Sequence, residues 1–137
     1  MNKDVIVDIV ATQPDGKFVL YMVEVGPWPE EQVVAELRRV QDRLYNFISV
    51  AVDGHLAKTY PDSVGRGVVI RLDCYDTPKE PVEEFFARFV AYNRNREDLA
   101  AAIRLNGFIS GLEFEYSRDT LADRSERQAM RHKGIID

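Results

Sequence analysis

"RGVVIRLDCYD", residues 66–76, is the stretch that decides the fold. Its side chains alternate between two sets, with the period of two that a β-strand imposes. The apolar set consists of Val68, Ile70, Leu72 and Cys74. The other set consists of Val69, Arg71, Asp73 and Tyr75. This alternation predicts a strand with one side toward a core and the other toward water.

Three more strands are predicted around it. The runs "DVIVDIVAT" (4–12) and "KFVLYMVEV" (17–25) are rich in β-branched and aromatic residues, and "QPDG" (13–16) separates them. Because Pro, Asp and Gly suit a tight turn, we expect a β-hairpin. In "GLEFEYS" (111–117), apolar and aromatic residues alternate with Glu113 and Glu115, which predicts a fourth strand.

Two long helices are predicted between these strands. Apolar residues recur at steps of three and four through residues 33–51, which predicts a helix over about 30–52 that stops at Asp53-Gly54. A second helix opens at "TPKEPVEE" (77–84). The run "NRNRED" (93–98) interrupts its apolar stripe, so we expect a bend or a restart with Asn95 as the new cap.

The expected element order is β-β-α-β-α-β followed by a tail helix. Two helices with one apolar stripe each suit one face of a single sheet. The predicted fold is therefore a two-layer α+β sandwich, with a mostly antiparallel four-stranded sheet and both long helices on one face. We expect residues 1–117 to form one domain and residues 118–137 to form a C-terminal helical tail, whose thin apolar face would be marginal alone.

Composition narrows the class of protein. A chain of 137 residues fits one domain, and a net charge of -5 lacks the overall basic footprint expected of a nucleic-acid-binding protein. Cys74 is the only cysteine and only two histidines accompany it, which excludes an intrachain disulfide and argues against a zinc cluster. The start of the chain lacks the apolar run of a signal peptide, and no run approaches the ~18 apolar residues of a membrane span. We expect a cytoplasmic protein of bacterial type.

The stretch "YPDSVGRGVVIRL" (60–72) has the glycines and charge of a phosphate-binding loop. Such loops follow a strand and open a helix, whereas this one follows a helix and opens a strand. It also lacks the Gly-Lys-Ser/Thr ending. We therefore interpret Gly65 and Gly67 as positions that need unusual backbone angles or a close approach of the chain.

The same region carries a resemblance. The helix "LRRVQDRLYNFISVAVDGHL", the turn "YPDSVGRGVVIRL" and the helix start "DTPKEPVEEF" resemble a family of small bacterial α+β domains of unknown function. Shared features are a helix ending in Asp/Ser-Gly-x-Leu, a Tyr-Pro-Asp turn, a Gly-Lys/Arg step and a Val-x-Ile strand. The resemblance covers about residues 4–117 and implies the fold, but it implies no activity.

No residue is assigned a catalytic, cofactor-binding or metal-binding role. Asp73 and Asp76 flank Cys74, which leaves open a metal or acid–base cluster, but a polar strand end is the simpler interpretation. Cys74 lies on the apolar side of its strand, which favours a core cysteine. His55 follows a helix stop and is expected to be a surface histidine.

The sheet face turned away from the helices is the candidate site. It should display carboxylates with embedded tyrosines. We expect the partner-binding residues to be Asp8, Tyr21, Arg71, Asp73, Tyr75, Glu113 and Glu115. Such a face is either an ordinary solvated surface or a docking surface for a basic protein, where carboxylates steer association and tyrosines supply contact area.

Three functional hypotheses remain. The first is a non-enzymatic bacterial protein-binding module, one form of which is an immunity-type protein that neutralises a basic toxin. The second is a small-molecule binder or enzyme with a pocket between sheet and helices, lined by Trp28, Phe85, Phe86, Phe89 and Tyr92. The third is a structural homo-oligomer, such as a homodimer that exchanges the tail helix. None of them calls for a cofactor, and we expect neither nucleic acid nor membrane as a partner.

Overall fold

The computed structural model describes residues 9–120, so residues 1–8 and 121–137 lie outside this account. Ten elements follow one another in this part of the chain. They are β1 (Ile9–Thr12), β2 (Phe18–Val25), the 3₁₀ helix η1 (Glu30–Gln32), α1 (Val33–Val52), α2 (His55–Thr59), the 3₁₀ helix η2 (Pro61–Ser63), β3 (Arg66–Tyr75), α3 (Lys79–Arg94), α4 (Glu97–Asn106) and β4 (Ile109–Asp119).

The four strands form one mixed sheet in the order β1-β2-β3-β4. Only β1 and β2 pair antiparallel, whereas β2–β3 and β3–β4 pair parallel. The predicted α+β class and the four strands are confirmed, but the expectation of a mostly antiparallel sheet is wrong. The cause is the position of the helices along the chain. A helix between two neighbouring strands returns the chain to the starting end of the sheet, so the next strand runs in the same direction.

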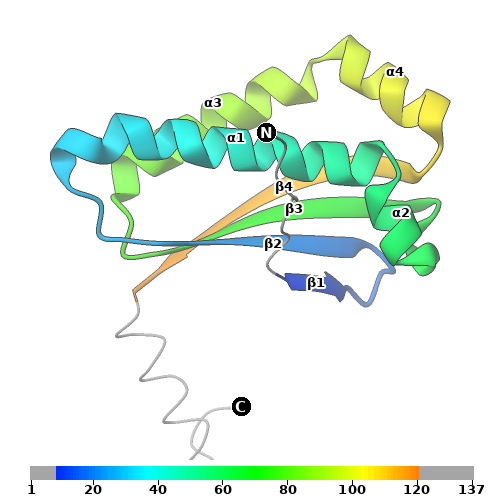
Figure 1. Ribbon diagram of the computed structural model, residues 1–137, viewed down its shortest axis with the longest axis horizontal. Coiled ribbons are helices and arrows are strands. Elements are labelled where there is room, and N and C mark those ends of the chain that lie inside the picture. The colour runs from blue at the N-terminus through cyan, green and yellow to red at the C-terminus, as the bar shows by residue number, and fades with distance from the viewer. Residues whose placement is uncertain (1–8, 121–137) are drawn as a thin grey trace, which may run out of the picture.

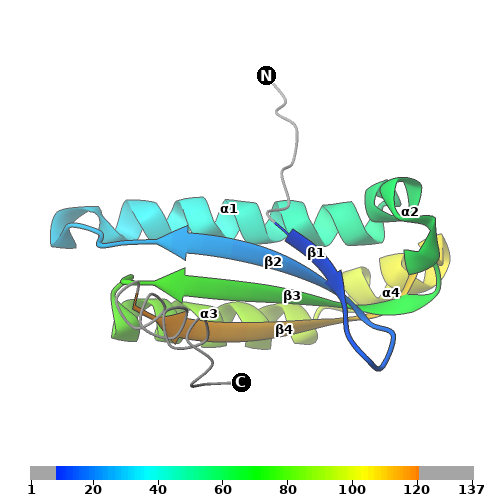
Figure 2. The same ribbon diagram turned by 90° about the horizontal axis from the view of Figure 1, so that it is seen from below.

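Both crossovers pass over the same face of the sheet. Figure 1 shows α1, α3 and α4 above the strands. Figure 2 shows the molecule from below, with the strands in front and the helices behind them. The predicted two-layer arrangement is therefore confirmed for residues 9–120. No helix of this part of the chain covers the lower face of the sheet.

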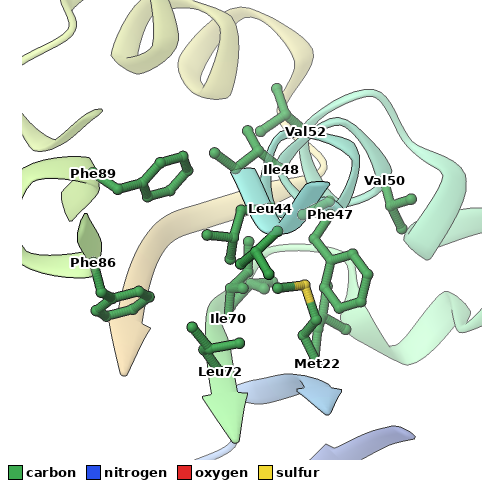
Figure 3. Packing of buried hydrophobic residues seen from close by; sticks show 14 of the residues in the cluster. Met22, Leu44, Phe47, Ile48, Val50, Val52, Ile70, Leu72, Phe86 and Phe89 are labelled. Carbon is green, nitrogen blue, oxygen red and sulfur yellow. The ribbon is translucent and has the colours of Figure 1, made fainter. Parts of the chain in front are cut away.

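The core lies between the two layers. Strand positions that alternate toward the helices carry Leu20 and Met22 on β2, and Ile70 and Leu72 on β3, and all four are fully buried. Figure 3 shows Met22, Ile70 and Leu72 meeting side chains of α1 and α3, with Leu44 at the centre. The apolar alternation of residues 66–76 thus predicts the buried side of the sheet correctly.

Element boundaries differ from expectation in a few places. The first helix starts as the 3₁₀ helix η1, and Gly54 ends α1 in the left-handed conformation as predicted. The short helix α2 was not predicted. The second long helix does restart, but Asn95 ends α3 and Arg96 precedes α4, so Asn95 is not the new cap. Strand β4 continues to Asp119, beyond residue 117 where the sequence predicts the domain to end.

Truncating Leu44 should destabilise the fold strongly. Its side chain is fully buried in the middle of the core, so Leu44→Ala is expected to lower the free energy of unfolding by about 2–5 kcal/mol. Val34 is exposed on the same helix, and Val34→Ala should change it by no more than ~0.5 kcal/mol. Urea denaturation measures both. Equal midpoints for the two variants would contradict the packing described above.

Candidate functional site

The sheet face opposite the helices, called the open sheet face below, brings together most of the expected partner-binding residues. Strand register aligns Tyr21, Arg71 and Glu115 in one row across β2, β3 and β4. Neighbouring rows on the same face contain Asp73, Tyr75 and Glu113. These six positions therefore share one surface, as the alternation predicts. Asp8 lies outside the described residues.

Arg71 is the centre of this face. Its Nε donates to Asp73 Oδ1 at 2.8 Å, and its Nη1 donates to Glu115 Oε1 at 3.5 Å. The guanidinium also lies over the ring of Tyr21, 5.7 Å from its centroid, within the range of a cation–π contact. The hydrogen bond to Asp73 is the main cause of a raised pKa of Arg71, so this side chain remains a cation. One arginine thus fixes the positions of two carboxylates and one tyrosine.

A second ion pair crosses the sheet near the start of the strands. Lys17 Nζ donates to Glu113 Oε2 at 2.6 Å, which raises the pKa of Lys17. To reach β4, the lysine stem passes over Gly67, where an added Cβ would lie 3.4 Å from Lys17 Cγ. That distance is an ordinary van der Waals contact, so it does not require a glycine at residue 67. Gly65, with a φ of 78°, does have one of the unusual backbone angles that the sequence predicts.

Two apolar residues on this face are unexpectedly buried. Val19 and Val69 point away from the helices, yet each is only 1% exposed. Their row lies between Gly67, crossed by Lys17, and the row of Tyr21 and Arg71. The open sheet face therefore has a small buried apolar area between the ion pairs of Lys17 and those of Arg71.

The open sheet face keeps an excess of negative charge after this pairing. Strand register places the carboxylates of Asp73, Glu113, Glu115 and Asp119 on it, with Arg71 and the Lys17 ammonium as the cations. Carboxylates outnumber cations by two to one at these positions. The acidic character expected from the sequence therefore remains, but most of these carboxylates have fixed partners rather than being free.

A buried carboxylate on the helix side was missed in the sequence. Glu24 follows Phe18, Leu20 and Met22 on the core side of β2 and is only 4% exposed. Arg39 binds it through two hydrogen bonds of 2.6 and 2.9 Å, and Arg43 adds a third of 2.6 Å. The sequence does contain a sign of this cluster. Glu24 occupies a position that the alternation of the strand assigns to the apolar side, and two arginines four residues apart follow on the next helix.

The carboxyl end of β3 holds a second buried polar group. Cys74 is buried, as predicted, and burial raises the pKa of its thiol to about 11 even though the neighbouring Thr77 lowers it. Burial likewise raises the pKa of Tyr116 to about 12. The hydroxyl of Tyr116 is buried without a hydrogen-bond partner within residues 9–120. A thiol that stays protonated at neutral pH is a poor nucleophile.

The aromatic residues expected to line a pocket separate into two groups. Trp28 and Phe86 are buried in the core, so they line no pocket between sheet and helices. Phe85, Phe89 and Tyr92 line a hollow of about 400 Å³ between α1 and α3. That hollow is shallow and opens on the outer surface of the helix layer. A more polar hollow, at the loop with Gly65 and Gly67, contains Lys17 and Arg66, whose donors are bound to Glu113 and to main-chain carbonyls.

The described part of the chain also lacks a metal cluster and a membrane-spanning helix. Among residues 9–120, no group of three or more His, Cys, Asp and Glu side chains is placed to hold a metal ion. His55 is exposed at the start of α2. Within the same range, no helix combines the length and apolar character that crossing a bilayer requires.

Removing both arginines from Glu24 should destabilise the protein. Arg39→Met with Arg43→Met leaves a buried carboxylate without its two partners, and the free energy of unfolding should fall by about 3–5 kcal/mol. Adding Glu24→Met removes the uncompensated charge and should recover most of that loss. Urea denaturation of the double and triple variants measures the difference. A triple variant no more stable than the double variant would refute this explanation.

The buried thiol should make the fold sensitive to alkali. Well below pH 9 the thiol is protonated in both the folded and the unfolded state, so it adds no pH dependence there. Between pH 9 and about 11 the unfolded thiol ionises while the folded one does not, and stability is lost as pH rises through this window. In Cys74→Val, the free energy of unfolding should decline less steeply between these pH values. An identical decline in both proteins would show that Cys74 does not contribute.

Comparison with known proteins supports the resemblance found in the sequence. The model of a family of unknown function (DUF6572) matches residues 1–99, which is well over half of the chain. Searches of curated proteins and of solved structures give no match. The matched region contains β1 to β3, α1 and α3, and so includes the central strand with Arg71. The chain therefore belongs to this family of unknown function, DUF6572.

Proposed function

We propose that the protein is a non-enzymatic protein-binding module that docks a basic partner on its open sheet face. One specific form of this function is an immunity-type protein of bacterial origin that neutralises a basic toxin. The observation that carries the proposal is the arrangement around Arg71, which holds Asp73, Glu115 and Tyr21 in fixed positions on a face that no helix of residues 9–120 covers.

Fixed carboxylates favour binding because less side-chain freedom is lost when the partner docks. The ion pairs of Arg71 and Lys17 order side chains that would otherwise be mobile on a wet sheet. Tyr21 and Tyr75 supply aromatic contact area on the same face. A partner with lysine or arginine side chains would meet an acidic surface that is already arranged.

The charge excess gives the proposal a kinetic signature. Exposed carboxylates act mainly on the rate of association, and salt screens them over a Debye length of about 8–10 Å. Binding by this face should therefore weaken as ionic strength rises. The raised pKa of Cys74 argues against the one cysteine as a nucleophile.

Neutral variants can test the face without breaking the fold. Glu113→Gln with Glu115→Gln removes two charges and keeps side-chain size, whereas a lysine at Asp73 would lie against Arg71. Asp42→Asn with Asp62→Asn is the matched control, because both residues are exposed and lie away from the open sheet face. Partners captured from a native-host lysate by each protein, at about 0.05 M and 0.5 M salt, are quantified by mass spectrometry.

We expect the wild type and the control variant to capture the same basic protein, and the Glu113→Gln, Glu115→Gln variant to capture at least several-fold less of it. The difference should shrink at the higher salt concentration. Equal capture by all three proteins at both salt concentrations would refute docking on this face. The immunity-type form requires in addition that the captured protein is a toxin whose activity falls when this chain is added in equimolar amount.

A further inference from the structure

The outer side of the helix layer carries a groove that the proposed function does not use. It runs between α1 and α3, which pack side by side above the sheet (Figure 1). Its apolar surface comes from Leu37 and Tyr45 on α1, and from Phe85, Phe89 and Tyr92 on α3. Tyr45 and Phe89 contact each other, with ring centroids 4.9 Å apart. We call this hollow and its rim the helix groove.

The helix groove has an exposed tyrosine, Tyr92, at one end and a proline, Pro81, at the other. Tyr92 lies toward the C-terminal end of α3 and is 65% exposed, which is unusual for a large aromatic side chain. Pro81 lies in the first turn of α3 and lines the hollow at the opposite end, beside Phe85. A protruding ring and a hollow on the same groove are the two halves of a self-complementary contact.

The charges on the rim are self-complementary too. Glu84 and Arg88 are one turn apart on α3, and both line the hollow. They form a long ion pair of 3.8 Å within the chain, and both side chains are largely exposed. A pair like this contributes little to folding. Because the two charges are opposite, a two-fold axis that passes between them sets each charge against the opposite charge of a second copy.

We propose that the helix groove is the interface of a homodimer, occupied by a second copy of this chain. A two-fold axis that passes between Glu84 and Arg88 places α3 of the two copies antiparallel. Each Glu84 then faces Arg88 of the second copy, and each Tyr92 lies beside Pro81 of the second copy. An interface of this kind is isologous, because the same patch serves both subunits.

The rim charges favour a second copy over the basic partner of the open sheet face. Glu84 and Arg88 cancel, and Gln41 is neutral, so the helix groove attracts neither an acidic nor a basic protein. The size of the face limits the interface, because its flat area is smaller than the surface that a specific interface buries per partner. A face of two helices is about 20 Å wide, and 16 residues of α3 extend about 24 Å, so the flat area is on the order of 500 Å² before side-chain relief is counted. Specific interfaces bury ~800 Å² of accessible surface per partner.

The dimer is independent of the proposed function. When the helix layers of two copies meet, the two open sheet faces point away from each other and stay accessible. The two proposals can therefore fail separately. Loss of the dimer would leave capture of a basic partner unchanged, and loss of capture would leave the dimer unchanged.

A glutamate at Tyr92 provides the first test. Light scattering of the full chain, at ~100 µM on a size-exclusion column, should give twice the 15.7 kDa chain mass for the wild type. Tyr92→Glu buries a charge in the proposed interface and should give the mass of a single chain. Leu105→Glu is the matched control, because Leu105 is an exposed apolar residue on α4 that does not line the helix groove, and this variant should remain a dimer.

Charge reversal provides the second test. Glu84→Arg alone, or Arg88→Glu alone, places like charges opposite each other and should raise the dimer dissociation constant at least ~10-fold. The double variant restores opposite charges in both copies and should return to within ~3-fold of the wild type. Circular dichroism confirms the fold of each protein. A monomeric wild type, a dimer that survives Tyr92→Glu, or a double variant no tighter than the singles would overturn the proposal.

Discussion

The parallel pairing of β3 with strands on both sides is the constraint on which the rest of the structure depends. Parallel neighbours require crossover helices, and here both crossovers pass over one face. Parallel sheets are ordinarily covered on both faces. In residues 9–120 no helix covers the second face, which instead carries the ion pairs of Lys17 and Arg71 with their carboxylate partners. The topology thus leaves exposed the face on which these ion pairs lie.

Much of the fold could be predicted from local pattern. The alternation in β3 identified the buried side of the sheet, and Asp53-Gly54 and residues 93–98 marked real helix ends. Strand direction was predicted wrongly because residue patterns specify which side of a strand is buried but not how it is paired. The order strand, helix, strand does contain that information, because a crossover helix between neighbouring strands makes them parallel. The short helix α2 has too few residues to show an apolar period.

The candidate surface was predicted in part, for a related reason. A period of two placed Tyr21, Arg71, Asp73 and Glu115 on one face, because faces follow from alternation alone. The contacts among them depend on strand order and register, which local pattern does not give. The same limit concealed the Glu24 cluster. There, a residue of β2 binds two arginines of α1, the helix that follows it in the chain. Interactions between distant segments were the ones that sequence reasoning did not reach.

The ion pair between Lys17 and Glu113 ties two distant segments together. Lys17 donates to Glu113 on β4, and its stem lies over residue 67 of β3 at an ordinary van der Waals distance. Strand β3 lies between β2 and β4, so the sheet itself makes no direct pairing between these two neighbours. The ion pair therefore links the turn between β1 and β2 directly to β4, two segments that share no strand pairing.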